Sequence, residues 1–299
     1  MDEATFLTAL RRLPLHPGAA NLRDDTASLA GLTITTDTLV EGVHFLPTDP
    51  PEDVAWKLLA TNLSDLAAKG ATPEGALLNY PLSGAAWDGA FLAGFDAALR
   101  HFACPLLGGD TVSLPAGAPR VLTLTAIGRD AAAPPRSGAR AGDALWVTGA
   151  IGDAGAGLAI AQGNDGPPEL LAAYRRPQPR LVEGRALAPH VHAMMDVSDG
   201  LLIDASRMAA ASGLAVTIDL AAVPLSDAYR AFRGGDRAAR LAAATAGDDY
   251  QLLFAAGPDW VPSVAATRVG HFAPGSGLTL LDAGGPVAPP ARLGFEHRA

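Results

Sequence analysis

The segment TASLAGLTITTDTLV, residues 26–40, is rich in β-branched and apolar residues on both sides of Gly31. Such residues favour strands and glycine favours turns, so the segment predicts two strands joined at Gly31. The chain after it is helical, because Pro50 and Pro51 precede a helical spacing of apolar residues that ends at Gly70: Val54, Leu58, Leu59, Leu63 and Leu66. The fold therefore begins with a strand pair followed by a helix.

Strands and helices keep alternating along the rest of the chain, but without strict βαβ regularity. The first half predicts strands at 76–82, 105–108 and 120–128 and a helix at 86–103. The second half predicts strands at 144–148, 193–197, 214–220 and 250–255, with short strands and loops after 262. Its predicted helices are 153–162, 169–175, 180–189, 200–212 and 236–245. This order favours two α+β domains over one doubly wound sheet.

A change in composition marks the domain boundary. The segment DAAAPPRSGARAGD, residues 130–143, is poor in large apolar residues and rich in Ala, Gly and Pro. We therefore expect an N-terminal domain at 1–135, built as a mixed β-sheet with flanking helices. A C-terminal α+β domain is expected at 136–299.

Composition excludes several classes of protein. The chain has 299 residues with 31 acidic against 22 basic side chains, whereas a general nucleic-acid binder would carry a basic face. No G-x-x-x-x-G-K-[ST] motif occurs, so a P-loop is excluded. The lone Cys104 fits a reducing compartment, and residues 1–14 lack the apolar run of a signal peptide or membrane span. We expect a cytoplasmic protein with neither nucleic-acid nor membrane partners.

The glycine-rich stretch GAIGDAGAG, residues 149–157, does not have the glycine spacing of a dinucleotide-binding motif. It predicts instead a tight strand-to-helix turn. Asp153 is the expected N-cap residue of the helix that follows.

Aspartates recur where strands end or turns begin: Asp24, Asp25, Asp37, Asp65, Asp110, Asp196, Asp199, Asp248 and Asp249. Each alone is typical of a turn or a helix cap. However, Asp37, Asp110 and Asp196 each end a β-rich or apolar run, so the ends of one sheet could bring them together. Clustered carboxylates repel one another unless a cation neutralises them, and oxygen ligands select hard cations such as Mg²⁺. The pattern indicates metal-assisted phosphoryl transfer from ATP.

Six segments closely resemble the thiamine-monophosphate kinase family: TTDTLVEGVHF (35–45), NLSDLAAKGATP (62–73), LLGGDT (106–111), RSGARAGD (136–143), VTGAIGDAGAGLAI (147–160) and DVSDGLLID (196–204). The resemblance runs from about residue 20 to the C-terminus. It implies ATP-dependent phosphorylation of thiamine monophosphate to thiamine diphosphate, with ATP between the two domains. It also implies a homodimer whose N-terminal domains pair through β-sheet.

The same resemblance implies roles for individual residues. Several Mg²⁺ ions would be held by Asp25, Thr35, Thr36, Asp37, Asp65, Asp110, Asp196 and Asp199. ATP would contact Gly109, Asp110, Arg136 and Ser198, and thiamine monophosphate would contact His44, Asp248 and Phe295. Successive strand side chains point to opposite faces, so either Thr35 or Thr36 can be a plain strand residue. No general base is assigned, because the second pKa of a phosphate monoester is about 6 and the acceptor oxygen is already largely ionised.

Three motifs depart from the family pattern. The glycine-rich lead G-I-G-D-D is Asn21-Leu22-Arg23-Asp24-Asp25 in this chain. The motif G-E-D-Y-E-L is GDDYQL at 247–252, and the tyrosine of G-Y-D-H-F is Phe295. These changes concern the turn at Asp25 and the details of the acceptor pocket.

Two alternatives remain open from the residues. One is another ATP-using member of the same superfamily. Selenophosphate synthetase needs a reactive cysteine near its N-terminus, and the hydrogenase-maturation member uses a C-terminal one; this chain has only Cys104 and ends His297-Arg298-Ala299. The other alternative is a non-catalytic Mg²⁺-nucleotide binding protein.

Overall fold

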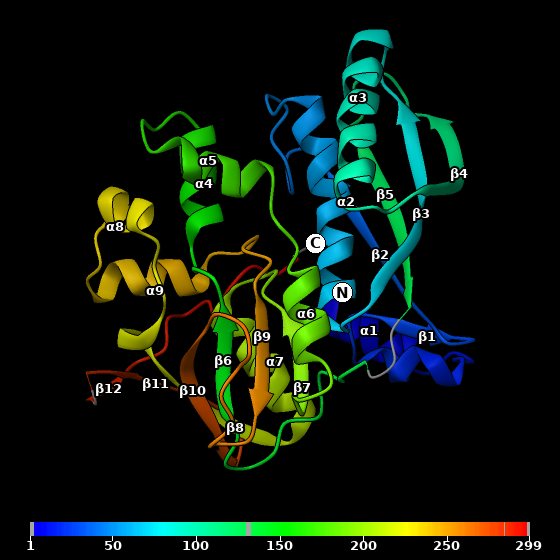
Figure 1. The fold of residues 1–299 in the computed structure, drawn as a ribbon. Helices are drawn as coiled ribbons and strands as arrows, with labels where there is room; N and C mark the ends of the chain where they lie inside the picture. Colours follow the sequence, from blue (N-terminus) through cyan, green and yellow to red (C-terminus); the bar gives the residue numbers. More distant parts are fainter. Residues whose placement is uncertain (1–2, 130–132, 284, 298–299) are drawn as a thin grey trace.

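The computed structural model describes residues 3–129, 133–283 and 285–297, and contains two sheets with helices between and around them (Figure 1). Residues 130–132 of the predicted boundary segment lie outside the described residues. The N-terminal sheet has the order β1-β2-β5-β3-β4, antiparallel except between β3 and β4. Its strands are β1 (Ala27–Leu29), β2 (Leu32–Val40), β3 (Thr72–Leu82), β4 (Leu106–Ser113) and β5 (Val121–Arg129).

The C-terminal sheet has the order β12-β11-β8-β10-β6-β9-β7 and is antiparallel except between β11 and β8. Its strands are β6 (Ala144–Thr148), β7 (Ala193–Asp196), β8 (Leu214–Asp219), β9 (Leu252–Ala256), β10 (Ala266–Pro274), β11 (Gly277–Asp282) and β12 (Gly285–Val287). Two mixed sheets with helices confirm the prediction of two α+β domains.

The hairpin predicted at Gly31 is present, with Gly31 at a φ of +80° between β1 and β2. The helices of the N-terminal half are α1 (Glu3–Leu10), the 3₁₀ turn η1 (Pro17–Leu22), α2 (Pro51–Ala68) and α3 (Ala85–His101). Those of the C-terminal half are α4 (Asp153–Ala161), α5 (Pro168–Arg175), α6 (Leu181–Leu187), α7 (Leu201–Ser212), the 3₁₀ turn η2 (Leu220–Ala222), α8 (Asp227–Arg233) and α9 (Arg237–Thr245). None of these helices is long and apolar enough to cross a membrane.

Two details differ from the expectation. The short helix α8 was not predicted, and it is set by Ser226, whose hydroxyl caps the Tyr229 amide at 3.0 Å. Asp153 does not cap α4: its carboxylate accepts from the Ser226 hydroxyl at 2.7 Å. The amides of Gly152 and Ala154 donate instead to Asp249, a residue from the distant GDDY loop. A buried carboxylate that is remote in sequence thus replaces the local cap.

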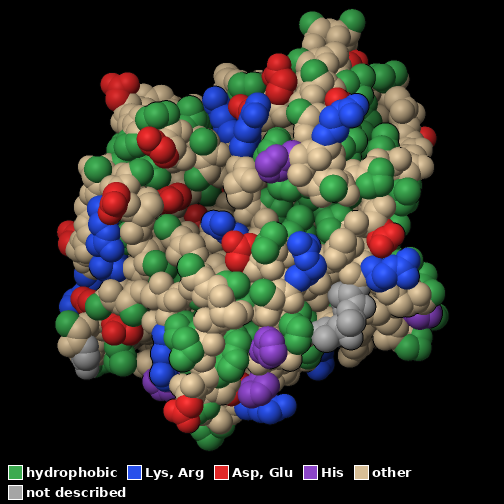
Figure 2. Space-filling view, in the orientation of Figure 1, with side chains coloured by type: hydrophobic (Ala, Val, Ile, Leu, Met, Phe, Trp, Pro, Cys, Tyr) green, Lys and Arg blue, Asp and Glu red, His purple; other side chains and the backbone are tan. Residues whose placement is uncertain are grey.

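Helix α2 is the element that joins the two domains (Figure 1). It packs on α3 and the N-terminal sheet on one side and on α6 and β7 on the other, and most of its residues are buried. Ion pairs add to this junction: Arg175 with Asp49 at 3.1 Å and Arg176 with Asp53 at 2.5 Å. Side chains of both charges accordingly lie next to each other over the junction of α2 and α5 (Figure 2).

The packing of α6 on α2 requires a glycine. A Cβ on Gly184 of α6 would lie 2.0 Å from the Ala67 carbonyl oxygen of α2. This is far inside van der Waals contact with a backbone atom, so a side chain at 184 would force the two helices apart.

We predict opposite effects for two helical Gly→Ala substitutions. Gly184→Ala should lower the free energy of unfolding by about 1–3 kcal/mol, because it overpacks the α2–α6 contact. The matched control is Gly89→Ala in α3, where a Cβ meets nothing within 4 Å. It should raise stability by about 0.5–1 kcal/mol through the lower chain entropy of the unfolded state. Urea unfolding of both variants provides the test, and equal effects at the two positions would contradict the packing argument.

Candidate active site

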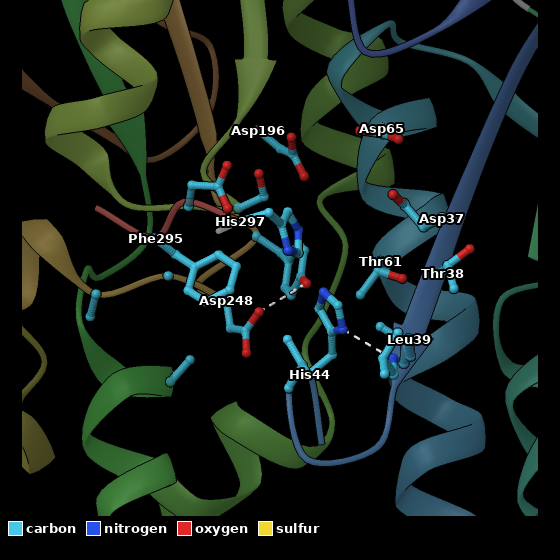
Figure 3. Close-up of a pocket in the computed structure, with 18 of the residues that line it drawn as sticks. Asp37, Thr38, Leu39, His44, Thr61, Asp65, Asp196, Asp248, Phe295 and His297 are labelled. Carbon is cyan, nitrogen blue, oxygen red and sulfur yellow. Dashed lines mark hydrogen bonds between the residues drawn. The ribbon is translucent and has the colours of Figure 1, made fainter. Parts of the chain in front are cut away.

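A pocket of about 750 Å³ opens between the two domains, and both contribute to its walls. Figure 3 shows Asp37, Leu39, His44 and Thr61 on one side and Asp248, Phe295 and His297 on the other, with Asp65 and Asp196 at the far end. Of the residues predicted for the site, the lining includes Asp25, Thr36, Asp37, His44, Asp65, Asp196, Ser198, Asp199, Asp248 and Phe295.

One face of α2 supplies polar groups to this region at intervals of four residues. Lys57, Thr61, Asp65 and Lys69 follow one another along the helix, and such spacing places side chains on one face. Apolar residues fill most of the remaining positions of α2 and anchor it on both sides. The helix therefore presents a row of polar and charged groups that its neighbours hold in place.

Three carboxylates meet at the acidic end of the pocket. Oxygens of Asp25, Asp65 and Asp196 all lie within 4.8 Å of one another. Asp196 ends β7 and accepts from the buried Ser64 hydroxyl of α2 at 2.6 Å, and the Thr35 hydroxyl of β2 donates to Asp65. These hydrogen bonds fix two of the three carboxylates, Asp65 and Asp196, in place.

Burial and mutual repulsion raise the pKa values of these carboxyls. Burial, together with the charges of Asp25 and Asp199, raises the pKa of Asp37 to about 6. Burial and the neighbouring aspartates raise the pKa of Asp65 well above its usual value. The same causes act on the pKa of Asp196. Repelling carboxylates of this kind are stabilised by a cation between them.

Asp25 behaves differently from the other members. Burial alone would raise its pKa, but the charges of Arg136 and Lys69 outweigh burial and lower it. Arg136 donates to Asp25 Oδ1, and the Lys69 ammonium lies 2.5 Å from Asp24 Oδ1 and 3.5 Å from Asp25 Oδ2. Asp25 thus enters the cluster as an ionised group.

Asp199 also has a cationic neighbour. Arg207 of α7 pairs with Asp199 and with Asp204, the latter at 3.0 Å. Asp204 is fully buried and accepts from the amides of Asp199 and Gly200, each at 3.1 Å, which fixes the DVSDG turn at the start of α7.

The other end of the pocket is aromatic. The ring centroid of His297 lies 5.3 Å from that of His44 and 5.0 Å from that of Phe295. Burial and the nearby His297 lower the pKa of His44. Asp248 accepts from the Lys57 ammonium at 2.7 Å. It also accepts from the Tyr250 hydroxyl at 3.1 Å, a bond drawn as the dashed line at Asp248 in Figure 3.

Some predicted residues lie apart from the pocket lining. Gly109 and Asp110 are on the edge strand β4, where Asp110 is exposed and bonds the Thr111 amide at 2.9 Å. Gly109 has a φ of +151°, and a Cβ there would lie 1.8 Å from the Leu78 carbonyl oxygen, so β4 needs a glycine to approach β3. Neither residue is among the described residues that line the pocket.

The two threonines of β2 point in opposite directions, as strand geometry requires. Thr35 is buried and bonds Asp65, whereas the Thr36 hydroxyl donates to the Leu124 carbonyl at 3.1 Å. Arg136 contacts the cluster through Asp25, to which its guanidinium donates. Its backbone amide donates to Asp24 Oδ2 at 3.2 Å. The metal, ATP and acceptor roles of all these residues stay predictions.

Sequence reasoning did not assign Lys57, Lys69, Ser64, Arg207 or His297 to the site. The four-residue spacing of polar groups within the apolar helix α2 was a usable signal for the two lysines. The spacing of three residues between Asp204 and Arg207 within α7 was a usable local signal for Arg207. No local signal exists for the contact of His297 with His44, because the two residues are far apart in the sequence.

The departures from the family pattern have local explanations. Ala20, Asn21 and Leu22 adopt positive φ values of 46°, 55° and 52°, and the Arg11 guanidinium donates to the carbonyls of Asn21 and Leu22 at 3.2 and 3.0 Å. Gln251 accepts from the Thr148 hydroxyl and from Arg180, at 3.0 and 2.8 Å, and does not line the pocket. The replacement of the second glutamate of the family motif by Gln251 therefore affects internal packing and not the pocket lining.

The acidic end fits a divalent metal ion. Its donors are carboxylate and hydroxyl oxygens, the ligand type that hard cations select. Asp25 Oδ2 is buried and, among the described residues, accepts no hydrogen bond; the Lys69 ammonium is 3.5 Å away. A cation bound closer to this oxygen would offset more of its desolvation.

These pKa shifts predict how stability depends on pH without metal. A carboxyl whose pKa is raised in the folded state takes up a proton more readily there than in the unfolded chain. Its charged form opposes folding above the folded-state pKa. The metal-free protein should therefore gain stability as the pH falls from about 7 to about 5, through the folded-state pKa of Asp37 at about 6.

Asp65→Asn should separate repulsion from metal binding at pH 8. The metal-free variant should be more stable than the native chain by about 1 kcal/mol, because one of the buried repelling charges is gone. Mg²⁺ should raise the melting temperature of the native chain but not that of the variant. If Mg²⁺ stabilises both equally, Asp65 does not bind the ion.

Comparison with known proteins places the chain in a family. Models of the AIR synthase related protein match it in two parts, the N-terminal domain at residues 23–129 and the C-terminal domain at 140–268. Thiamine-monophosphate kinase of Caulobacter vibrioides is 40% identical over 94% of this chain and 86% of its own length.

Solved structures agree with this match. AaThiL, complexed with AMPPCP and TMP, superposes with a TM-score of 0.88 at 29% identity, over 99% of this chain and 97% of that one. Thiamine-monophosphate kinase from Stenotrophomonas maltophilia has a TM-score of 0.77 at 36% identity, over 95% of each chain. The alternative of another superfamily member is thereby set aside, and the chain belongs to the thiamine-monophosphate kinase family of the AIR synthase-related superfamily.

Proposed function

We propose that the chain transfers the γ-phosphoryl group of ATP to thiamine monophosphate, giving thiamine diphosphate and ADP. The observation that carries the proposal is one pocket, walled by both domains, with a carboxylate cluster at one end and aromatic rings at the other. The acidic end suits metal-bound phosphates. The aromatic end suits a flat cationic ring.

Asp25, Asp37, Asp65, Asp196 and Asp199 would hold Mg²⁺ in this proposal, with Thr35 orienting Asp65. When bound, Mg²⁺ would neutralise the phosphate oxygens of ATP and lessen their repulsion of the acceptor phosphate. The raised pKa values of Asp37, Asp65 and Asp196 support this assignment, because they arise from burial and from the negative charges of neighbouring aspartates, both of which a bound cation would offset.

The transfer step needs positioning more than proton removal. An oxygen of the acceptor phosphate forms a bond to the γ-phosphorus while the bond from that phosphorus to the bridging oxygen of ADP breaks. The acceptor oxygen is already ionised near neutral pH, since the second pKa of a monoester is about 6. The work of the chain is then to hold two polyanions in line and limit access of water.

The acceptor end would be formed by His44, Asp248 and Phe295. The thiazolium ring carries a positive charge, which is favoured by a carboxylate and by aromatic ring faces. Lys57 holds one oxygen of Asp248 and also donates to the His44 carbonyl at 3.0 Å, so a single ammonium fixes both walls of this end.

The ATP contacts of Gly109, Asp110, Arg136 and Ser198 are part of the proposal. Ser198 lines the pocket directly. Arg136 is anchored on Asp25, so its remaining guanidinium nitrogens are the groups that could meet a phosphate. Gly109 and Asp110 lie on β4, away from the pocket of their own chain, so they would have to act at the pocket of a second chain.

A homodimer through the N-terminal sheet fits this requirement. Helices α2 and α3 pack against each other, and only one face of the sheet is covered by α2 (Figure 1). The opposite face and the edge strand β4 expose apolar side chains, among them Leu77, Leu106, Leu107 and Val112. An open edge with exposed apolar residues favours pairing with another chain.

The proposal also includes a cytoplasmic location without nucleic-acid or membrane partners. The net charge of −9 supports the lack of nucleic-acid binding. The buried, unpaired Cys104 is compatible with a reducing compartment.

The acceptor is tested by ADP release. With ATP and Mg²⁺, thiamine monophosphate should stimulate ADP release, whereas unphosphorylated thiamine should not, because it lacks the acceptor oxygen. Asp196→Asn is the matched variant and should lower turnover by orders of magnitude while keeping the fold. If the monophosphate gives no stimulation, a non-catalytic binding protein is the better reading.

The dimer is tested by sedimentation velocity. The native chain should sediment as a dimer, and Leu107→Asp should yield monomers, because it places a charge in the apolar contact. Since Asp110 would serve the partner's pocket, the monomeric variant should lose turnover and keep its far-ultraviolet circular dichroism. A native chain that sediments as a monomer would contradict both the dimer and the role of Asp110.

A further inference from the structure

The two lysines of the chain have unusual positions. Only Lys57 and Lys69 occur among 22 basic residues, and their side chains are 3% and 1% exposed. All other cations are arginines, so the chain uses a compact ammonium only where the charge is enclosed. An ammonium is a point charge with three donors, whereas a guanidinium is a planar fork.

Among the described residues, the polar contacts of the Lys69 ammonium are all with oxygen atoms. Its ammonium lies 2.5 Å from Asp24 Oδ1, 3.5 Å from Asp25 Oδ2, 3.1 Å from the Met194 carbonyl and 3.3 Å from the Pro134 carbonyl. Two carboxylates and two backbone carbonyls around one charge are the kind of ligand set that binds a hard cation. The shell combines β7 and the segment after the N-terminal sheet with the Asp24–Asp25 turn.

The Lys69 ammonium lies at the C-terminal end of helix α2. Lys69 is the C-cap residue of α2, where the helix dipole favours a positive charge. The next residue, Gly70, turns the chain away at a φ of +68°. The ammonium is therefore tethered by the helix and cannot exchange with solvent as a free ion does.

We propose that the Lys69 ammonium takes the place of a monovalent cation beside the acidic cluster. It contacts Asp24 Oδ1 and Asp25 Oδ2 and, together with Arg136 on Asp25 Oδ1, neutralises the Asp24–Asp25 pair. Asp25 Oδ2, which accepts no hydrogen bond among the described residues, then stays available toward Asp65 and Asp196. Lys69 is a positioning residue in this scheme, which rests on the proposed metal site but uses no substrate.

Rescue by monovalent ions tests the proposal in the intact chain without Mg²⁺, ATP or acceptor. Lys69→Ala leaves a space lined by oxygens and should lower the melting temperature on the order of 10 °C, since it breaks a buried ion pair. At equal ionic strength, K⁺ or NH₄⁺ should restore part of this loss, by about 2 °C or more, and tetramethylammonium should not. The native chain should respond alike to all three salts.

Lys69→Met is the matched control, because it removes the charge but fills the space. Its melting temperature should fall and should not depend on which cation is present. If Lys69→Ala responds equally to K⁺ and to tetramethylammonium, Lys69 contributes only packing and the proposal is wrong.

A second measurement applies if Lys69→Ala does not fold. Asp24→Asn combined with Lys69→Met should be more stable than Lys69→Met alone, because the unpaired carboxylate is gone. No gain in the double variant would contradict the counter-charge role. Because these experiments use no substrate, a negative kinase assay with successful K⁺ rescue would reject the proposed function and keep the tethered cation.

Discussion

The structure depends on the forced proximity of buried carboxylates that repel one another. Asp25, Asp65 and Asp196 come from a turn before β1, from α2 and from the end of β7, and their oxygens lie within 4.8 Å. Such an arrangement costs folding free energy, so other interactions must hold it. Helix α2 does so, since it is packed between the two domains, and its Ser64 bonds Asp196 directly. The site therefore lies where both domains pack against one helix.

Basic side chains divide the site into parts with different charge. Lys69 and Arg136 offset the Asp24–Asp25 pair, Arg207 offsets Asp199, and Lys57 offsets Asp248. No such cation pairs with Asp65 or Asp196 among the described residues, so burial and the neighbouring aspartates raise the pKa values of both. The excess negative charge is thus concentrated at Asp65 and Asp196, where a divalent ion would bind. At the acceptor end, Lys57 offsets the charge of Asp248, which suits a substrate that carries both a positive and a negative group.

Local patterns in the sequence predicted most of the elements, because apolar spacing and glycine turns act over a few residues. The hairpin at Gly31 and the helix from Pro51 are examples. Features made by distant residues were not predictable: Asp249 caps α4 in place of Asp153, and Lys57 pairs with Asp248, which is 191 residues away. The resemblance supplied the aspartates of the site. It did not supply the lysines, nor the position of Asp110 on an edge strand outside the pocket.

Binding of divalent ions by the converging carboxylates can be seen by anomalous diffraction from crystals grown with Mn²⁺ and a non-hydrolysable ATP analogue. We expect Mn²⁺ peaks bonded to oxygens of Asp25, Asp65 and Asp196, beside the phosphates of the nucleotide. A fully occupied nucleotide with no Mn²⁺ at these three carboxylates would contradict this expectation.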